Sequence, residues 1–198
     1  MQRLPGSVSN PAHGGYNVGV KLSVIVVIVD GGTQLDRCLS ALATQQLAPE
    51  LDVIVPWDTT LGDMVSFAAR YQAFRFLPMG SVTTHALAAS HAGLHELYDA
   101  RRTVGLTAAT GDLVAMLEDR SVPESEWART AVQLHAEHRH EVIGGAMASG
   151  RDSLVSLADY LCDFYRFQPP FVGGVRPYVS YVNICYKRAA LERTRPLW

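Results

Sequence analysis

The sequence lacks the charge excess and the long apolar run that mark two common classes of protein. Its 17 Lys and Arg face 19 Asp and Glu, for a net charge of -2. This balance argues against a nucleic-acid binder held by a broad basic face. The longest apolar run, 24–29, is far shorter than the roughly 20 residues that a membrane helix needs. No membrane-spanning segment is therefore expected.

Paired cysteines and a secretory leader are also missing. Cys38, Cys162 and Cys185 lie far apart and form no CxxC pair, which argues against a disulfide framework or a cysteine zinc site. Residues 1–20 contain Gly, Pro and Asn but no apolar signal-peptide core. We therefore expect a loose leader over 1–20 and a single domain over 21–198, in a cytoplasmic protein.

What the chain does contain is a regular succession of apolar runs and helical patterns. The run 21–29 is rich in β-branched residues and does not alternate with polar ones, which is typical of a strand covered on both faces. A capping box at Ser121 and Glu124 predicts a helix start. The other expected strands are 51–55, 74–77, 112–117, 142–147 and 179–186, and the other expected helices are 34–46, 63–71, 84–109 and 153–167. This succession predicts an α/β domain with a mainly parallel sheet.

Acidic residues follow three of these strands. Asp30 ends the first, Asp58 the second, and Glu118, Asp119 and Arg120 end the strand 112–117. Ligands of parallel α/β sheets bind at the carboxyl ends of the strands. Two readings of the adjacent acids stay open: a site for a metal–nucleotide complex with magnesium or manganese, or a solvated strand end whose acids balance Arg120. The glycines at 31–32 likewise fit either close approach to a phosphate or a tight turn.

Several segments, taken in order, resemble family-2 glycosyltransferases, which have the GT-A fold of the nucleotide-diphospho-sugar transferases. LSVIVVIVDGG with RCLSAL is similar to the first strand and helix of that family, and LDVIVPWDTT to its second strand and Asp-containing turn. ARRTVGLTAATGDLVAMLEDRSVP resembles the family segment RNxGxxxAxGxxxxxLDDDxxxP, and YVSYVNICYKRAAL resembles GxNxxYRRxxL. VIGGAM is similar to the family's GG turn. The resemblance covers about 21–192 and implies an α/β/α sandwich.

The resemblance also implies roles for single residues. In the family, the matching positions line the nucleobase pocket (Val27, Val29, Asp30), stand near the base or ribose (Asp58), belong to the RNxG element (Arg102, Gly105), form the DxD-like metal and sugar-nucleotide site (Glu118, Asp119, Arg120) and lie on the acceptor side (Asn183). Arg102 is expected to contact nucleotide or to stabilise the strand ends, and Glu118 and Asp119 to be the metal ligands. The implied activity is inverting sugar transfer from a nucleotide-diphospho-sugar to an unknown acceptor, with a manganese or magnesium ion.

The sequence departs from the family at some of these positions. Arg120 replaces the last acid of the DxD, so it either swings away from a metal ion or takes over part of its role by pairing with diphosphate. Thr103 replaces the Asn of RNxG, and no residue matches the catalytic base. The alternative to an active enzyme is a catalytically silent GT-A-like fragment or nucleotide-binding module. The chain is C-terminally short compared with the family, so we expect the acceptor-side segment to be lacking. We therefore expect an open groove beside Asn183, lined by Tyr178 and Tyr181, that a second copy or a partner covers.

Overall fold

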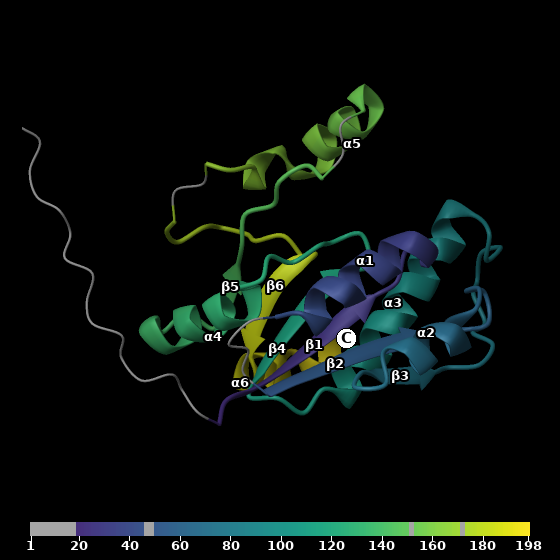
Figure 1. The fold of residues 1–198 in the computed structure, drawn as a ribbon, viewed down its shortest axis with the longest axis horizontal. Coiled ribbons are helices and arrows are strands. Elements are labelled where there is room, and N and C mark those ends of the chain that lie inside the picture. Colours follow the sequence, from purple (N-terminus) through teal and green to yellow (C-terminus); the bar gives the residue numbers. More distant parts are fainter. Residues whose placement is uncertain (1–18, 46–49, 151–152, 171–172) are drawn as a thin grey trace, which may run out of the picture.

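A mixed sheet of six strands forms the middle layer of the protein (Figure 1). The computed structural model describes residues 19–45, 50–150, 153–170 and 173–198, so nearly all of the expected leader 1–20 lies outside the described residues. The strands are β1 (Lys21–Val27), β2 (Glu50–Trp57), β3 (Arg75–Pro78), β4 (Leu113–Glu118), β5 (Val142–Gly144) and β6 (Asn183–Lys187). Their order in the sheet is β3-β2-β1-β4-β6-β5. The first four are mutually parallel, whereas β6 runs antiparallel to both β4 and β5.

Helices cover both faces of this sheet. They are α1 (Gly32–Ala43), α2 (Met64–Arg70), α3 (His91–Ala108), α4 (Trp127–Glu137), α5 (Leu154–Phe164) and α6 (Arg188–Thr194), with short 3-10 helices η1 (Tyr165–Phe167) and η2 (Arg195–Leu197). Side chains from α1, α2 and α4 share one buried cluster with the strands, and side chains from α3 and α6 share the other. The expected α/β class with a mainly parallel sheet is confirmed, and the layers form an α/β/α sandwich.

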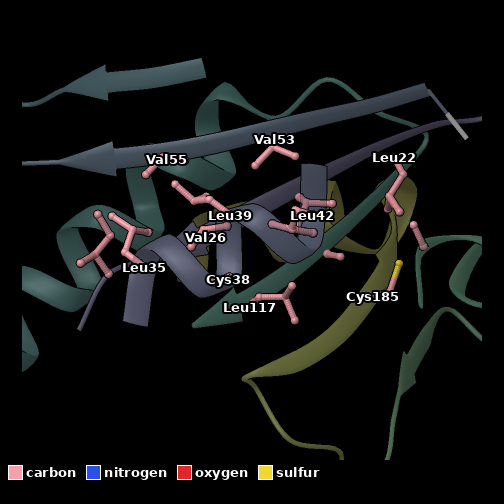
Figure 2. Close-up of a cluster of buried hydrophobic side chains, with 14 of the residues drawn as sticks. Leu22, Val26, Leu35, Cys38, Leu39, Leu42, Val53, Val55, Leu117 and Cys185 are labelled. Atoms are coloured by element: carbon pink, nitrogen blue, oxygen red, sulfur yellow. The ribbon is translucent and has the colours of Figure 1, made fainter. Parts of the chain in front are cut away.

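The central strands are apolar throughout because both of their faces are buried. In β1, Val24 and Val26 belong to the cluster on one face, and Ile25 and Val27 to the cluster on the other. Figure 2 shows the first cluster, in which Leu35, Cys38, Leu39 and Leu42 of α1 lie against the strands. Among the described residues, no helix is both long and apolar enough to cross a membrane.

Two helices begin later than their sequence patterns predict. The helix predicted from Ser121 begins at Trp127, and no side chain of its own caps it. Gln45 supplies the cap instead: its amide oxygen accepts from Ala128 N at 2.9 Å, and its amide nitrogen donates to the Glu124 carbonyl at 3.0 Å. The helix predicted over 84–109 begins at His91, after its N-cap Ser90.

The last third of the chain departs most from the expected boundaries. The strand predicted over 179–186 begins only at Asn183, the strand predicted over 142–147 ends at Gly144, and α6 was not expected at all. The helix predicted over 153–167 is α5 followed by η1. In Figure 1, α5 (green) stands clear of the sheet and of the helices that cover it. Its exposed apolar side chains include Leu154 at 85% and Val155 at 78%.

Candidate functional site

The polar residues predicted at three strand ends come together at one edge of the sheet. β1 lies between β2 and β4, and Val27 pairs with Glu118 where these strands end. The loop that follows β1 therefore runs beside Asp119 and Arg120. The parallel arrangement brings the ends of β1, β2 and β4 to one place, as expected for a ligand site of this type of sheet.

Asp119 shapes the loop after β1. Its carboxylate is fully buried and accepts the backbone N–H groups of Val29 at 2.9 Å, Asp30 at 3.0 Å and Gly31 at 2.6 Å. Burial raises the pKa of Asp119, although the three backbone hydrogen bonds act to lower it. Gly31 has φ of 69°, the left-handed region that favours glycine. Both oxygens of Asp119 are thus engaged by the chain itself.

Arg120 forms a bidentate ion pair with Asp30 at this edge of the sheet. Its Nε donates to Asp30 Oδ2 at 2.6 Å, and its terminal NH2 nitrogen donates to Oδ1 at 2.8 Å. The side chains are 52% and 42% exposed. Arg120 is therefore a solvent-accessible cation held in front of the loop that Asp119 fixes.

Asp58 and Arg101 form the buried support behind this loop. Arg101 Nε donates to Asp58 Oδ2 at 2.6 Å, and Arg101 NH1 donates to the Ile28 carbonyl at 2.7 Å. Thr60 donates to Asp58 through its backbone N–H at 2.9 Å. Burial acts to raise the pKa of Asp58, but the hydrogen bonds from Arg101 and Thr60 outweigh it and lower the pKa. Because Asp58 is fully buried, it fixes the site rather than lining it.

The role in stabilising the strand ends that was expected of Arg102 falls to its neighbour Arg101. Arg102 pairs with Asp99 of its own helix at 2.9 Å and stays partly exposed. Gly105 carried the signal that identifies Arg101, because residues four apart share one helix face. A Cβ at Gly105 would lie 2.4 Å from Ile25 Cγ2, so that face of α3 packs against the sheet. Gly105 thus lets the helix approach the strands.

Glu118 is the last residue of β4. The Tyr98 hydroxyl lies close to its carboxylate. Burial raises the pKa of Glu118 to about 7, against the lowering effects of Tyr98 and Arg120. Tyr181 lies close enough to feel the charges of both Glu118 and Asp163, and these charges add to the burial that raises its pKa. Glu118 thus acts electrostatically on the segment that precedes β6.

The described residues do not fit the metal ion that the DxD position implies. Among them, no group of three His, Cys, Asp or Glu side chains is placed to hold a metal ion. Asp119 is occupied by backbone N–H groups, and Asp30 by Arg120. No step of the chemistry below is therefore routed through a metal.

A groove of about 610 Å³ lies between α3, α5 with η1, and the segment before β6. Aromatic side chains line much of it (Phe164, Tyr165, Phe167, Tyr178, Tyr181). Tyr178 and Tyr181 are 52% and 56% exposed. Arg166 lies over the rings of Tyr165 and Tyr178, 5.4 Å from each centroid. Asp163 of α5 is a carboxylate in the same lining.

Asn183 lies outside this lining. Its Oδ1 accepts from Trp127 Nε1 at 3.0 Å, and its Nδ2 donates to the Ala146 carbonyl at 3.3 Å. The side chain thus ties α4 to the loop that follows β5. The expected groove residues Tyr178 and Tyr181 do line a groove. Asn183 does not line it, because its side chain bonds to Trp127 and Ala146.

No model of a protein family matches this sequence, and neither does any curated protein. Solved structures do match it. The crystal structure of TarS 1-349 from S. aureus superposes with a TM-score of 0.62 at 18% identity, over 88% of this chain and 49% of that one. Its complex with UDP-GlcNAc gives 0.61 at 19% identity, over 88% and 47%. The mannosyltransferase PcManGT from Pyrobaculum calidifontis, in complex with GDP-Man and Mn2+, gives 0.55 at 16% identity, over 91% and 50%.

These likenesses show that the chain has the GT-A fold that its sequence segments indicate. The chain spans about half the length of TarS 1-349. At these identities the likeness extends to the fold alone, so donor, acceptor and metal are argued from this chain's own residues.

Proposed function

We propose that the protein is a family-2-like glycosyltransferase that takes a nucleotide-diphospho-sugar donor and transfers its sugar with inversion to an acceptor. One observation carries the proposal. In a chain with the GT-A fold, the ends of β1, β2 and β4 meet at one place, where an accessible Arg120 lies in front of a loop fixed by Asp119. The neighbours in complex with UDP-GlcNAc and with GDP-Man support a nucleotide-sugar as the donor.

The donor would lie along the loop after β1. In this proposal Val29 and Asp30 border the nucleobase, Val27 is buried in the core beneath them, and Arg120 faces the diphosphate. Asp58 acts indirectly, because its buried pair with Arg101 holds the Ile28 carbonyl and so the direction of that loop. Guanidinium groups bind phosphate oxygens through two parallel hydrogen bonds, which suits Arg120 to this place.

The acceptor would enter the groove between α3, α5 and the segment before β6. Inverting transfer needs a base that takes the proton of the acceptor hydroxyl and a cationic group that stabilises the departing diphosphate. Asp163 is our candidate for the base, since it lines the groove and Tyr181 feels both its charge and that of Glu118. Tyr178 and Tyr181 offer exposed rings for apolar sugar faces.

A binding module without turnover is the alternative. A second copy or a partner that completes the groove would instead belong with the active transferase. We also propose a cytoplasmic, reducing compartment, which suits the three free thiols.

Hydrolysis of a nucleotide-sugar panel separates the two functions, because release of free sugar to water needs no acceptor. The panel consists of uridine, guanosine and thymidine diphospho-sugars, and thermal shift with each nucleoside diphosphate is measured in parallel. Binding at about a hundred times the dissociation constant stabilises a protein by about 2.7 kcal/mol. Stabilisation with turnover supports the transferase, and stabilisation without turnover of any donor supports the binding module.

A further inference from the structure

We infer that Arg120 replaces a divalent cation at this site, so that nucleoside diphosphate binds without metal when the guanidinium exchanges Asp30 for phosphate oxygens. The inference rests on the proposed function and deepens it, since it states how the charged part of the donor is held. It differs from the metal dependence that the DxD position implies.

The first support is the state of the acidic side chains. A magnesium or manganese ion prefers several oxygen ligands that are free to coordinate it. Asp119 directs both oxygens at backbone N–H groups and has no exposed surface. Asp30 is engaged by both prongs of Arg120. A metal ion would have to break one of these arrangements and sit beside the Arg120 charge.

The second support is the geometry and exposure of the Arg120–Asp30 pair. The guanidinium uses Nε and one terminal nitrogen on the two carboxylate oxygens, the same fork that binds two oxygens of a phosphate. Both side chains are about half exposed. Exposed ion pairs contribute little to stability, so a multiply charged diphosphate competes well with a single carboxylate.

The third support is the balance of charge at the strand ends. Asp30, Glu118 and Asp119 are acidic, and Arg120 is the basic residue bonded to one of them. Without Arg120 the three acids would face an anionic diphosphate without the exposed cation that now pairs with Asp30. Asp30 thus acts as a stand-in for the phosphate, holding Arg120 in place until the nucleotide arrives.

The two members of the pair are therefore expected to act in opposite directions. Calorimetric titrations with uridine diphosphate and guanosine diphosphate are run in EDTA and in manganese. We expect the unchanged protein to bind one of them with little dependence on manganese. Asp30→Asn frees Arg120 and strengthens binding in EDTA, whereas Arg120→Gln weakens it by about 10- to 100-fold, as loss of a charge-assisted contact does. Arg120→Asp, which sets a second acid beside Glu118, is expected to bind only with manganese.

A matched ion pair at the other end of the strands serves as the control. Arg193 and Glu141 lie 2.5 Å apart and are 58% and 54% exposed, much like Arg120 and Asp30. Arg193→Gln and Glu141→Gln are expected to leave nucleotide affinity unchanged. Thermal melts of all variants confirm that each is folded before its affinity is compared.

Three outcomes contradict the inference. Binding that requires manganese in the unchanged protein refutes it and leaves the proposed function standing. Equal weakening by Asp30→Asn and Arg120→Gln shows that the pair is structural and does not exchange. Absence of binding to either nucleotide, with or without manganese, refutes the proposed function itself and the inference with it.

Discussion

Arg101 and Asp58 are 43 residues apart in the sequence, and their side chains meet at 2.6 Å where β1 and β2 end. Arg101 is 2% exposed and Asp58 is fully buried. The same guanidinium also reaches the Ile28 carbonyl at 2.7 Å and Thr60 Oγ1 at 3.1 Å. One buried cation thus joins helix α3 to the ends of two strands, directly behind the loop on which the proposed donor site is built.

We predict that Arg101→Gln destabilises the protein strongly. The change leaves the buried Asp58 carboxylate without its cation, and breaking a buried pair in this way costs about 3–5 kcal/mol. Urea unfolding followed by circular dichroism measures the loss. Arg102→Gln is the matched control, because Arg102 pairs only within its helix and is partly exposed. It is expected to change stability by less than about 1 kcal/mol. Equal effects of the two substitutions would contradict the assigned division of roles.

The central strands could be predicted because their sequences leave one interpretation. A strand such as β1, buried on both faces, is an uninterrupted β-branched run, and polar residues end it sharply at Asp30. The edge elements gave weaker signals. The start of α4 depends on Gln45, which is 83 residues from the Ala128 N–H that it caps. No local capping pattern contains that information.

The site could be predicted as a location but not as a set of contacts. The carboxyl ends of parallel strands meet whatever their side chains do, so Asp30, Asp58 and Glu118 were expected together. Which of two adjacent arginines turns inward depends on helix register, since neighbouring residues differ by about 100° in direction. Gly105 indicates which face of the helix is buried, but this becomes evident only from its close contact with Ile25 in the structure. The Arg120–Asp30 pair joins residues 90 apart and has no local signature.

Gly105→Ala is predicted to disturb the packing of α3 on the sheet. The added Cβ would lie 2.4 Å from Ile25 Cγ2 and 3.2 Å from Pro56 Cγ, in a region where both neighbours are buried. Overpacking of this kind costs about 1–3 kcal/mol. Chemical unfolding measures it, with Gly62→Ala as the control, since nothing lies within 4 Å of a Cβ built there. A stable Gly105→Ala variant would show that α3 can move outward freely.

The buried His135 predicts a loss of stability as the solution becomes acidic. Its Nε2 lies 3.2 Å from the Cys185 carbonyl oxygen, and burial lowers the pKa of the ring below its usual value of 6.5. The unfolded chain therefore takes up a proton below about pH 6.5 that the folded protein refuses. The contribution of His135 is complete above that pH and is lost as the pH falls toward the lower folded pKa.

The measurement for His135 is the slope of unfolding free energy against pH between about 5 and 6.5, where a single proton accounts for at most about 1.4 kcal/mol per pH unit. His135→Gln is expected to flatten this slope. His138→Gln, which changes an exposed histidine just beyond the end of the same helix, is expected to leave it as it was. An unaltered slope in His135→Gln would mean that other groups carry the acid sensitivity.

The groove between α3, α5 and the segment before β6 yields a prediction about turnover. Asp163 lines the groove, whereas Asp159, one turn earlier on α5, lies outside the lining and is exposed. If Asp163 takes the proton of the acceptor hydroxyl, Asp163→Asn removes the base and keeps the shape of the side chain. Loss of a general base lowers a rate by about 100- to 10,000-fold. The loss is expected in kcat, with KM for the nucleotide-sugar unchanged, because the proposed donor site lies at the strand ends.

Asp159→Asn is the matched control for this test, since it makes the same chemical change on the same helix without altering the groove. Nucleotide-sugar hydrolysis is followed for both variants beside the unchanged protein, and thermal shift with nucleoside diphosphate reports whether the donor site survives. Full turnover in Asp163→Asn would move the base to another residue, and Glu118, which lies close to Tyr98 at the end of β4, would be the next to substitute. A rise in KM with kcat unchanged would instead assign Asp163 to binding, because a base that acts only in the transition state leaves ground-state affinity alone.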